Sequence, residues 1–227
     1  MYNIAIILAG GIGSRVGGST PKQLLPLDDG RSVLEHSVDA FEQAPCIDEI
    51  AIVMHPDWMD EAKALCEKNN WRKLTQIIPG GEERWESSWH ALLAYANSQL
   101  PTPDSQLSLW FHDAARPFVS QRILSDIAAA LEQHDAVTVA VPVTDTLYRV
   151  ADEHVKAIPS RSEYMRAQTP QAFHYDVVFQ AYAQAVADED LCATDDAGIV
   201  RKYAPSHKIY IVAGEEANRK ITYKEDL

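Results

Sequence analysis

Short apolar runs alternate along the chain with longer amphipathic segments. The apolar runs are rich in β-branched residues and are bounded by breakers, as buried parallel strands are. We expect strands at Ile4–Leu8, Ile50–Met54, Thr75–Ile78, Leu107–Phe111, Val137–Val141 and Ile209–Val212. The amphipathic segments have helical periodicity, and we expect helices at Val33–Gln43, Trp58–Asn69, Arg84–Leu100, Gln121–Gln133 and Asp176–Ala187. This alternation predicts an α/β fold with a doubly wound, mostly parallel sheet.

The segment 142–173 departs from the alternation. Residues Asp145–Val150 and Val155–Ile158 alternate in polarity like two antiparallel strands around an acidic turn. We interpret the segment as a β-arm that protrudes from the main sheet. The strand edges of such an arm need a cover, so we expect a homodimer in which one arm packs against the other.

The first predicted strand ends in a glycine-rich turn that is followed by two cations. The turn and the cations comprise Ala9, Gly10, Gly11, Gly13, Arg15 and Lys22. Glycine lets the main chain approach a ligand and adopt positive φ, so the N–H groups of such a turn can cradle phosphates. The cations indicate a nucleoside triphosphate that is about to react. The alternative is a tight turn that binds nothing.

Two commoner glycine motifs do not fit this turn. A dinucleotide fingerprint beginning at Gly11 needs glycine or alanine where Val16 stands, and a helix directly afterwards. Gly17, Gly18 and Pro21 interrupt any such helix. A Walker A loop requires a glycine, then four residues of any kind, then Gly-Lys-Ser/Thr, and the sequence contains no such string. Hydride transfer with NAD and P-loop chemistry are therefore disfavoured.

A second polar loop follows the predicted strand Leu107–Phe111. Ligands of doubly wound sheets lie beyond the carboxyl ends of the strands, where Asp113 can hold Mg²⁺ and Arg116 can reach a phosphate. The alternative makes Asp113 a loop cap and Arg116 its surface partner. His112 is expected to be a hydrogen-bonded structural residue rather than a base.

A third loop, Gly80-Gly81, precedes the helix expected from Arg84. The glycines allow a base or a ribose to approach the backbone, and Ser87, one turn into the helix, can hydrogen-bond a ligand. For Arg84 two interpretations remain open: it contacts a ligand, or it pairs with Glu82 or another acidic neighbour. All three loops are expected at one edge of the sheet.

Composition and charge exclude several classes of protein. The 227 residues fit a single domain spanning 1–227. No apolar run approaches the ~20 residues that cross a bilayer, and no basic leader precedes the first strand, so we expect a cytoplasmic protein that binds no membrane. Three widely spaced cysteines predict neither a disulfide scaffold nor structural zinc. The net charge of −13 argues against nucleic-acid binding.

Six sequence blocks together resemble the 2-C-methyl-D-erythritol 4-phosphate cytidylyltransferase family. The blocks, in the family's order, are Leu8–Arg15, Pro21–Gln23, Gly80–Arg84, His112–Pro117, Gln168–Gln171 and Asn218–Thr222. They cover the chain from end to end, whereas the glycine-rich signature alone is shared with other sugar-nucleotide transferases. The resemblance implies a Rossmann-like domain that dimerises through a β-arm. It also implies that CTP and a polyol phosphate, with Mg²⁺, give a CDP-polyol and pyrophosphate.

The resemblance further implies a role for individual residues. Contacts to cytidine and the triphosphate are implied for Ala9, Gly10, Gly11, Gly13, Gly81 and Ser87. Charges around the α-phosphate are implied for Arg15, Lys22 and Lys220. Contacts to the polyol phosphate, some of them made from the partner subunit's arm, are implied for Asp113, Arg116, Thr146, Arg161 and Thr169. The reaction joins two anions, so it needs alignment and neutralisation rather than a general base.

Two departures leave the acceptor open. Ala9-Gly10-Gly11 stands where methylerythritol enzymes often have two alanines before the glycine, and this turn also resembles that of ribitol-5-phosphate cytidylyltransferases. The sequence ends at Leu227, where relatives usually continue into a further helix. We expect 2-C-methyl-D-erythritol 4-phosphate as the acceptor, with ribitol 5-phosphate as the alternative. A non-catalytic nucleotide-binding module is disfavoured because Arg15, Lys22 and Asp113 are all present.

Overall fold

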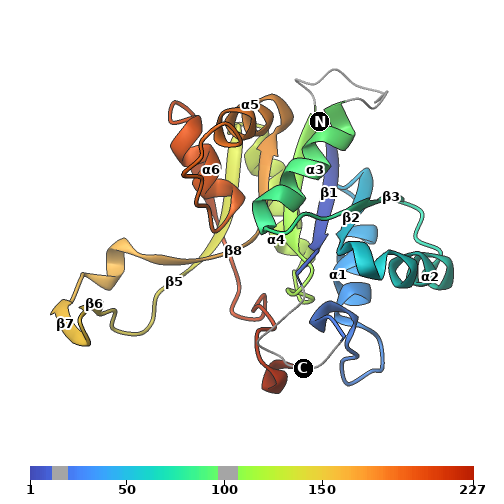
Figure 1. Ribbon diagram of the computed structural model, residues 1–227, viewed down its shortest axis with the longest axis horizontal. Helices are drawn as coiled ribbons and strands as arrows, with labels where there is room; N and C mark the ends of the chain where they lie inside the picture. Colours follow the sequence, from blue (N-terminus) through green and yellow to red (C-terminus); the bar gives the residue numbers. More distant parts are fainter. Residues whose placement is uncertain (12–19, 97–106) are drawn as a thin grey trace.

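A seven-stranded, mostly parallel sheet forms the centre of the molecule, in the strand order β3-β2-β1-β4-β8-β5-β9 (Figure 1). The computed structural model describes residues 1–11, 20–96 and 107–227. The sheet consists of β1 (Tyr2–Ala9), β2 (Glu49–Met54), β3 (Leu74–Pro79), β4 (Leu107–Asp113), β5 (Ala136–Pro142), β8 (Met165–His174) and β9 (Ile209–Ala213). All six strands expected from the apolar runs are present, and the α/β fold class is confirmed.

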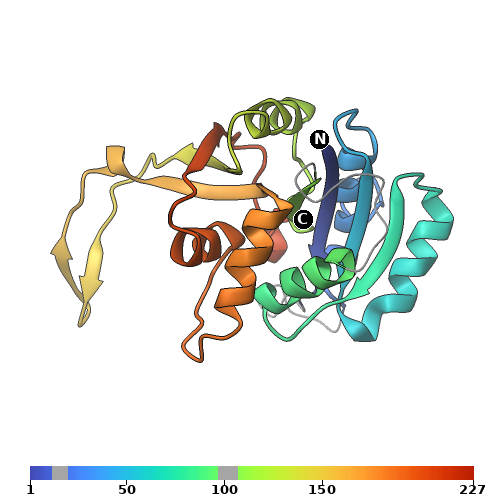
Figure 2. The same ribbon diagram turned by 90° about the horizontal axis from the view of Figure 1, so that it is seen from above.

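Helices cover both faces of the sheet (Figure 2). They are α1 (Val33–Glu42), α2 (Met59–Asn69), α3 (Arg84–Ala96), α4 (Gln121–Leu131), α5 (Tyr175–Ala185) and α6 (Asp196–Tyr203). The end of the helix expected to reach Leu100 lies outside the described residues. None of the described helices has the length and apolarity needed to cross a bilayer.

Strand β1 shows why the central strands read as unbroken apolar runs. Ala5 and Ile7 belong to the core cluster that includes residues of α1, α2 and α4. Ile4 and Ile6 point to the opposite face and belong to the cluster that includes residues of α3, α5 and α6. Successive side chains of a strand alternate between faces, so a sheet covered on both sides needs apolar residues at every position.

Strand β8 corrects the predicted boundaries of the arm. The segment 142–173 was expected to leave the sheet, but residues 165–173 lie within it, where β8 pairs antiparallel with both β4 and β5. Its polar residues Gln168, Thr169 and Gln171 are buried and hydrogen-bonded. Buried polar side chains with partners carry no apolar signal, which is why the pattern did not indicate a sheet strand.

The arm itself is a short hairpin that projects from the sheet between β5 and β8 (Figure 1). It is formed by β6 (Arg149–Ala151) and β7 (His154–Ala157), which pair antiparallel with each other. Asp152 and Glu153 make the turn with φ of 50° and 62°. The antiparallel pair around an acidic turn is therefore as expected.

Helix α6 was not expected. Asp195 caps it by accepting a hydrogen bond from the backbone N–H of Gly198 at 2.9 Å. The helix is short and contains Gly198, which weakens helical propensity, so its sequence read as a loop. It matters because it carries Asp196 into the interior.

Candidate functional site

One cavity of about 640 Å³ lies at the carboxyl ends of the parallel strands β1, β3 and β4. Its described lining comes from the turn after β1, the loop before α3, the end of β4, the short helix η1 (Lys22–Leu24) and the C-terminal segment. The predicted site residues among them are Ala9, Gly10, Gly11, Lys22, Gly81, Ser87, Asp113 and Lys220. The three glycine and polar loops thus converge at one sheet edge, as predicted.

Close packing, rather than positive φ, explains the glycines of the first and third loops. A Cβ on Gly10 would lie 3.1 Å from the Ser87 hydroxyl, and one on Gly80 would lie 3.0 Å from it. A Cβ on Gly81 would lie 2.3 Å from the Cβ of Glu86. Among the glycines that the structure describes, only Gly30 has a positive φ. The loops approach each other because these positions carry no side chain.

The same contact shows what the Ser87 hydroxyl does. Its hydroxyl accepts a hydrogen bond from the backbone N–H of Gly81 at 3.1 Å. The hydroxyl therefore holds the glycine loop at the start of α3. By contrast, no described atom lies within 4 Å of a Cβ built on Gly11, which faces open space.

Gln23 is a site residue that sequence reasoning missed. Its side chain is buried, and its Nε2 donates to the carbonyl oxygens of Ala9 at 2.5 Å and Gly11 at 2.9 Å. These bonds fix the glycine turn from outside the strand. The only signal in the sequence was its place beside Lys22 in a block shared with the family.

Cations from opposite ends of the chain meet at the cavity. Lys22 Nζ donates to the carbonyl oxygen of Ile221 at 2.7 Å, and Lys220 Nζ donates to Asp113 Oδ2 at 2.7 Å. Ile221 is buried, and its N–H donates to the carbonyl of Ala115 at 2.8 Å, which seats the C-terminal segment against the end of β4. Arg15 and Gly13 lie outside the described residues.

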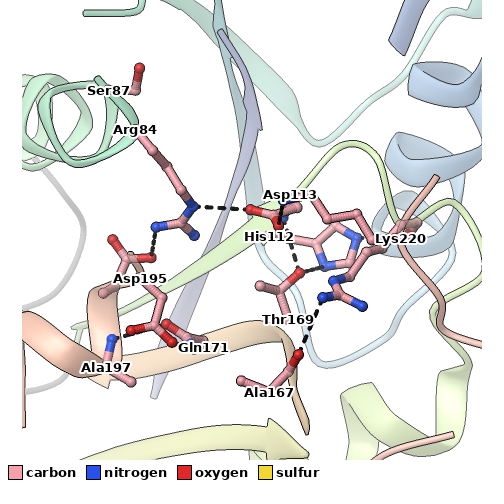
Figure 3. A network of polar contacts seen from close by, with 12 residues as sticks. Arg84, Ser87, His112, Asp113, Ala167, Thr169, Gln171, Asp195, Ala197 and Lys220 are labelled. Carbon is pink, nitrogen blue, oxygen red and sulfur yellow. Dashed lines mark hydrogen bonds and ion pairs between the residues drawn. The ribbon is translucent and has the colours of Figure 1, made fainter. Parts of the chain in front are cut away.

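Asp113 is the centre of a charge network (Figure 3). Its Oδ1 accepts from Arg84 Nε at 3.1 Å, its Oδ2 accepts from Lys220, and its backbone N–H donates to Thr169 Oγ1 at 3.0 Å. Burial raises the pKa of this carboxyl, but the charges of Arg84 and Lys220 outweigh burial and hold the pKa far below its ordinary value. Asp113 is therefore ionised.

Arg84 pairs with acidic side chains, as the second of its two interpretations expects, but these partners are distant in the sequence. It pairs with Asp113 and, through Nη1 at 2.8 Å, with Asp196 Oδ2, rather than with Glu82. It also lines the cavity. Burial would lower the pKa of the guanidinium, but the charges of Asp196 and Asp113 raise it above its ordinary value.

The residues present do not fit a magnesium site built by the protein alone. Both oxygens of Asp113, the predicted ligand, are already paired with cations. Within the ranges that the structure describes, no three histidine, cysteine, aspartate or glutamate side chains gather closely enough to hold a metal ion. Mg²⁺ takes several hard oxygen ligands, so an ion here would need most of them from a ligand and from water.

Arg116 and Thr169 lie behind Asp113 rather than in the cavity lining. Arg116 donates to the carbonyl oxygens of Asn218 at 2.9 Å and Ala167 at 3.3 Å. Its Nε is buried and has no hydrogen-bond partner among the residues that the structure describes. The alternative in which Arg116 pairs with Asp113 on the surface does not hold, since no ion pair joins the two side chains.

Thr146 and Arg161 are not brought to the cavity within one chain. Both lie on the arm, and Arg161 Nη1 donates to the carbonyl oxygen of Thr144 at 2.5 Å. The arm projects away from the strands whose carboxyl ends form the cavity (Figure 1). Their predicted role therefore requires an arm from another copy of the chain.

His112 is enclosed by hydrogen bonds on both sides of its ring. Nε2 lies 3.0 Å from the carbonyl oxygen of Arg116, and Nδ1 lies 3.1 Å from Thr169 Oγ1. The residue is fully buried, and its ring packs against Phe41 at 4.9 Å. Burial lowers the pKa of the imidazole to about 4. The ring is neutral at pH 7 and fits the predicted structural role.

The chain is similar to known proteins over nearly its whole length. Residues 3–227 match the family model described as 2-C-methyl-D-erythritol 4-phosphate cytidylyltransferase. The chain is 42% identical to the 2-C-methyl-D-erythritol 4-phosphate cytidylyltransferase of Thermobifida fusca, over 98% of this chain and 89% of that protein. It is also 37% identical to a bifunctional ribulose 5-phosphate reductase/CDP-ribitol pyrophosphorylase of Haemophilus influenzae, over 99% of this chain and 46% of that protein.

The fold matches solved structures of the same kind. The crystal structure of 4-diphosphocytidyl-2C-methyl-D-erythritol synthase from Anaerococcus prevotii superposes with a TM-score of 0.83 at 30% sequence identity, and the match covers 99% of this chain and 92% of that one. Sequence and fold therefore agree over nearly the whole chain.

We expect His112 to bind a proton only at a pH well below that of an ordinary histidine. Because its folded pKa of about 4 lies below the ordinary 6.5, the unfolded chain binds the proton first. The stability that His112 contributes is complete above about pH 6.5 and is lost as the pH falls toward about 4. We expect the ring signals in NMR spectra, assigned by comparison with His112→Gln, to remain neutral down to about pH 5. An inflection near pH 6.5 would contradict the buried, doubly bonded ring.

Proposed function

Since this chain belongs to the 2-C-methyl-D-erythritol 4-phosphate cytidylyltransferase family, we propose how its cavity transfers a cytidylyl group from CTP to that polyol phosphate. The chain is a nucleotidyltransferase, and its products are a CDP-polyol and pyrophosphate. One observation carries the assignment of the site: the glycine loops, Lys22, Lys220 and the Arg84–Asp113 pair line a single cavity. Among the described residues, the groups proposed to bind the nucleotide and to stabilise its phosphates therefore face one space.

We assign CTP to the side of the cavity formed by the glycine loops. The backbone of Ala9, Gly10 and Gly11 can approach the triphosphate closely because no side chain intervenes at the two glycines. Gly81 and Ser87 would contact the nucleoside from the opposite loop. Gly13 lies outside the described residues, and its contact with the triphosphate stays a prediction.

The bond changes require little proton movement. A phosphate oxygen of the acceptor attacks the α-phosphorus of CTP, the bond from that phosphorus to the bridging oxygen breaks, and pyrophosphate leaves with the electron pair. The attacking oxygen is already ionised at neutral pH, so no general base is needed. His112 supports this view because its buried ring has both nitrogens engaged.

Charge stabilisation is the task of the cations. Lys22 and Lys220, together with Arg15, would stabilise the charge that grows on the α-phosphoryl oxygens. In the structure, Lys220 is paired with Asp113, and Lys22 donates to the carbonyl oxygen of Ile221. Substrate phosphates would replace these partners, so the two lysines are held near their working positions in advance.

Mg²⁺ would enter with the nucleotide rather than wait in a protein-built site. When bound, the ion supplies charge neutralisation between phosphate oxygens. Asp113 is the described carboxylate at the right place to face it, but both of its oxygens are occupied by cations. We therefore expect the protein residues to bind the acceptor more directly than they bind the metal.

The acceptor end is assigned to Asp113, Arg116 and Thr169. Thr169 accepts from the backbone N–H of Asp113, and Arg116 has a buried Nε with no partner on the described residues. Such a donor is costly to leave unpaired. A small shift of the guanidinium toward an acceptor phosphate would satisfy it.

A second copy of the chain would complete the acceptor site. The arm's hairpin and the segments that join it to β5 and β8 expose several large apolar side chains: Tyr148, Val150, Val155, Ile158, Tyr164 and Met165. Contiguous exposed apolar surface marks an interaction site. In a homodimer built on this surface, the partner's arm would bring Thr146 and Arg161 to the cavity.

The proposed function is tested by the release of pyrophosphate. With CTP and Mg²⁺, we expect turnover with 2-C-methyl-D-erythritol 4-phosphate and a kcat/KM at least about 100-fold lower with ribitol 5-phosphate, since a polyol site rejects a poorly matched acceptor. The Ala9-Gly10-Gly11 turn and the 37% identity to the CDP-ribitol pyrophosphorylase favour ribitol 5-phosphate as the second candidate. Turnover with ribitol 5-phosphate but not with 2-C-methyl-D-erythritol 4-phosphate would make ribitol 5-phosphate the acceptor.

Removal of the charge on Lys22 tests the role of the cations. We expect Lys22→Gln to lower kcat by about 10²–10³, the cost of losing one preorganised charge-stabilising donor. The matched control is Lys63→Gln, which removes an exposed lysine paired with Asp60 on α2. If the Lys22→Gln enzyme retains the wild-type kcat, Lys22 does not stabilise the transition state.

Complementation between inactive variants tests the shared site. Lys22→Gln and Arg161→Gln each should impair every site of their own homodimers. In a mixed dimer, one of the two sites receives a normal Lys22 and a normal Arg161, so random exchange of subunits should restore about one quarter of the wild-type activity. If Arg161 acts in its own subunit, mixing restores nothing. A chain that sediments as a monomer would exclude the homodimer.

A further inference from the structure

Arg84 connects Asp113 to a second buried carboxylate that the proposed mechanism does not use. Nε of Arg84 lies 3.1 Å from Asp113 Oδ1 (Figure 3). Nη1 of Arg84 lies 2.8 Å from Asp196 Oδ2. Asp113 ends β4, Arg84 begins α3, and Asp196 begins α6. The side chain of Asp196 is completely buried, at 0% exposure. The guanidinium is thus the link between α6 and the cavity.

Asp196 is held by Tyr182, and its neighbours in the chain are held by Gln171. The hydroxyl of Tyr182, which is fully buried on α5, donates to Asp196 Oδ1 at 2.5 Å. Gln171 on β8 fixes the start of α6, because its Nε2 donates to Asp195 Oδ2 at 2.8 Å and its Oε1 accepts from the backbone N–H of Ala197 at 2.9 Å. The far end of the network is therefore anchored in the core.

The two cations that pair with Asp113 differ in how exposed their side chains are. The side chain of Lys220 is 41% exposed, whereas that of Arg84 is 25% exposed and ends on the buried Asp196. A planar guanidinium can engage two carboxylates at once, which an ammonium on a flexible chain does less well. When substrate phosphate draws Lys220 away, Arg84 remains to neutralise and orient Asp113.

We propose that Arg84, anchored by Asp196, is a positioning residue that fixes the Asp113 carboxylate for the acceptor. This inference rests on the proposed function, in which Asp113 contacts the polyol phosphate. Asp196 and Tyr182 act through Arg84 and touch no substrate. The arrangement makes α6 a support of the acceptor site, although α6 lines no part of the cavity.

The test compares acceptor and nucleotide kinetics in three variants. Arg84→Lys keeps the charge but loses the bridge, Asp196→Asn removes the anchor, and Arg84→Gln/Asp196→Asn removes one buried charge of each sign so that the core stays balanced. We expect each to raise the KM for the acceptor and to lower kcat, by up to about 100-fold for the double variant, since a small misplacement of a positioned group has that effect. The KM for CTP should change by less than about threefold.

Asp188→Asn is the matched control. Asp188 accepts a hydrogen bond from the Tyr203 hydroxyl and pairs with Lys202, so this change removes a tyrosine–aspartate contact at the other end of α6. It should leave both KM values and kcat unchanged. An equal effect of Asp188→Asn would mean that α6 matters only for general stability, and the proposal would be wrong.

A double-mutant cycle separates positioning from an independent effect. In an Asp113→Asn background, Arg84→Gln/Asp196→Asn should add less than about a threefold further loss, because the carboxylate that it orients is gone. Fully additive losses would overturn the proposal, as would wild-type kinetics in the double variant alone.

A measurement without substrate distinguishes failure of this inference from failure of the proposed function. If the wild-type enzyme releases no pyrophosphate with either polyol phosphate, the proposed function fails. The inference is then judged by the ¹³C signal of the Asp113 carboxyl, assigned with Asp113→Asn. Arg84→Gln/Asp196→Asn should move its titration to higher pH, because the Arg84 charge is the largest influence that lowers it. An unmoved titration would show that Arg84 does not act on Asp113.

Discussion

The ionised carboxylate of Asp113, at 9% exposure, needs cations and hydrogen-bond donors close to it. A charge taken out of water is tolerated only when partners replace its hydration. Here the partners of the carboxylate come from far apart in the sequence: Arg84 from α3 and Lys220 from the C-terminal segment. The backbone N–H of Asp113 in addition donates to Thr169 on β8. These contacts together fix the relative positions of four segments at the edge of the cavity.

This pairing also explains how a chain with a net charge of −13 can receive two anionic substrates. The cations are not displayed as an open positive patch, because Lys220 is engaged by Asp113 and Lys22 by a backbone carbonyl. An anion must offer better geometry than these internal partners to displace them. A triphosphate presents several oxygens to the backbone N–H groups and cations at once, whereas a single small anion does not. Internal pairing thus favours a polyanion that fits the cavity.

The sequence pattern predicted what depends on local physics and missed what depends on distant partners. Parallel strands such as β1 and β4 are covered on both faces, so their apolar runs were recognisable. Because parallel strands run in the same direction, the loops that follow them were expected at one edge of the sheet. Strand β8 was missed because Gln168, Thr169 and Gln171 are polar residues whose burial is compensated by hydrogen bonds. The partner of Arg84 was missed for a related reason: Asp196 comes from an unexpected helix, and no spacing rule connects the two.

The position of β8 links the arm to the chemistry. The arm leaves the sheet after β5 and returns at β8, with Pro142 opposite Met165 at the base. From there the same strand continues through Thr169, whose hydroxyl accepts from the backbone N–H of Asp113, to Gln171, which fixes the start of α6. Strand β8 pairs with β5 from its base at Met165, shifts register at Thr169-Pro170, and pairs with β4 from Gln171 onward. One strand therefore carries both the base of the arm and the hydroxyl that accepts from Asp113. In a homodimer of the proposed kind, the surface that joins the subunits and the contact that holds Asp113 would lie along the same strand in each chain.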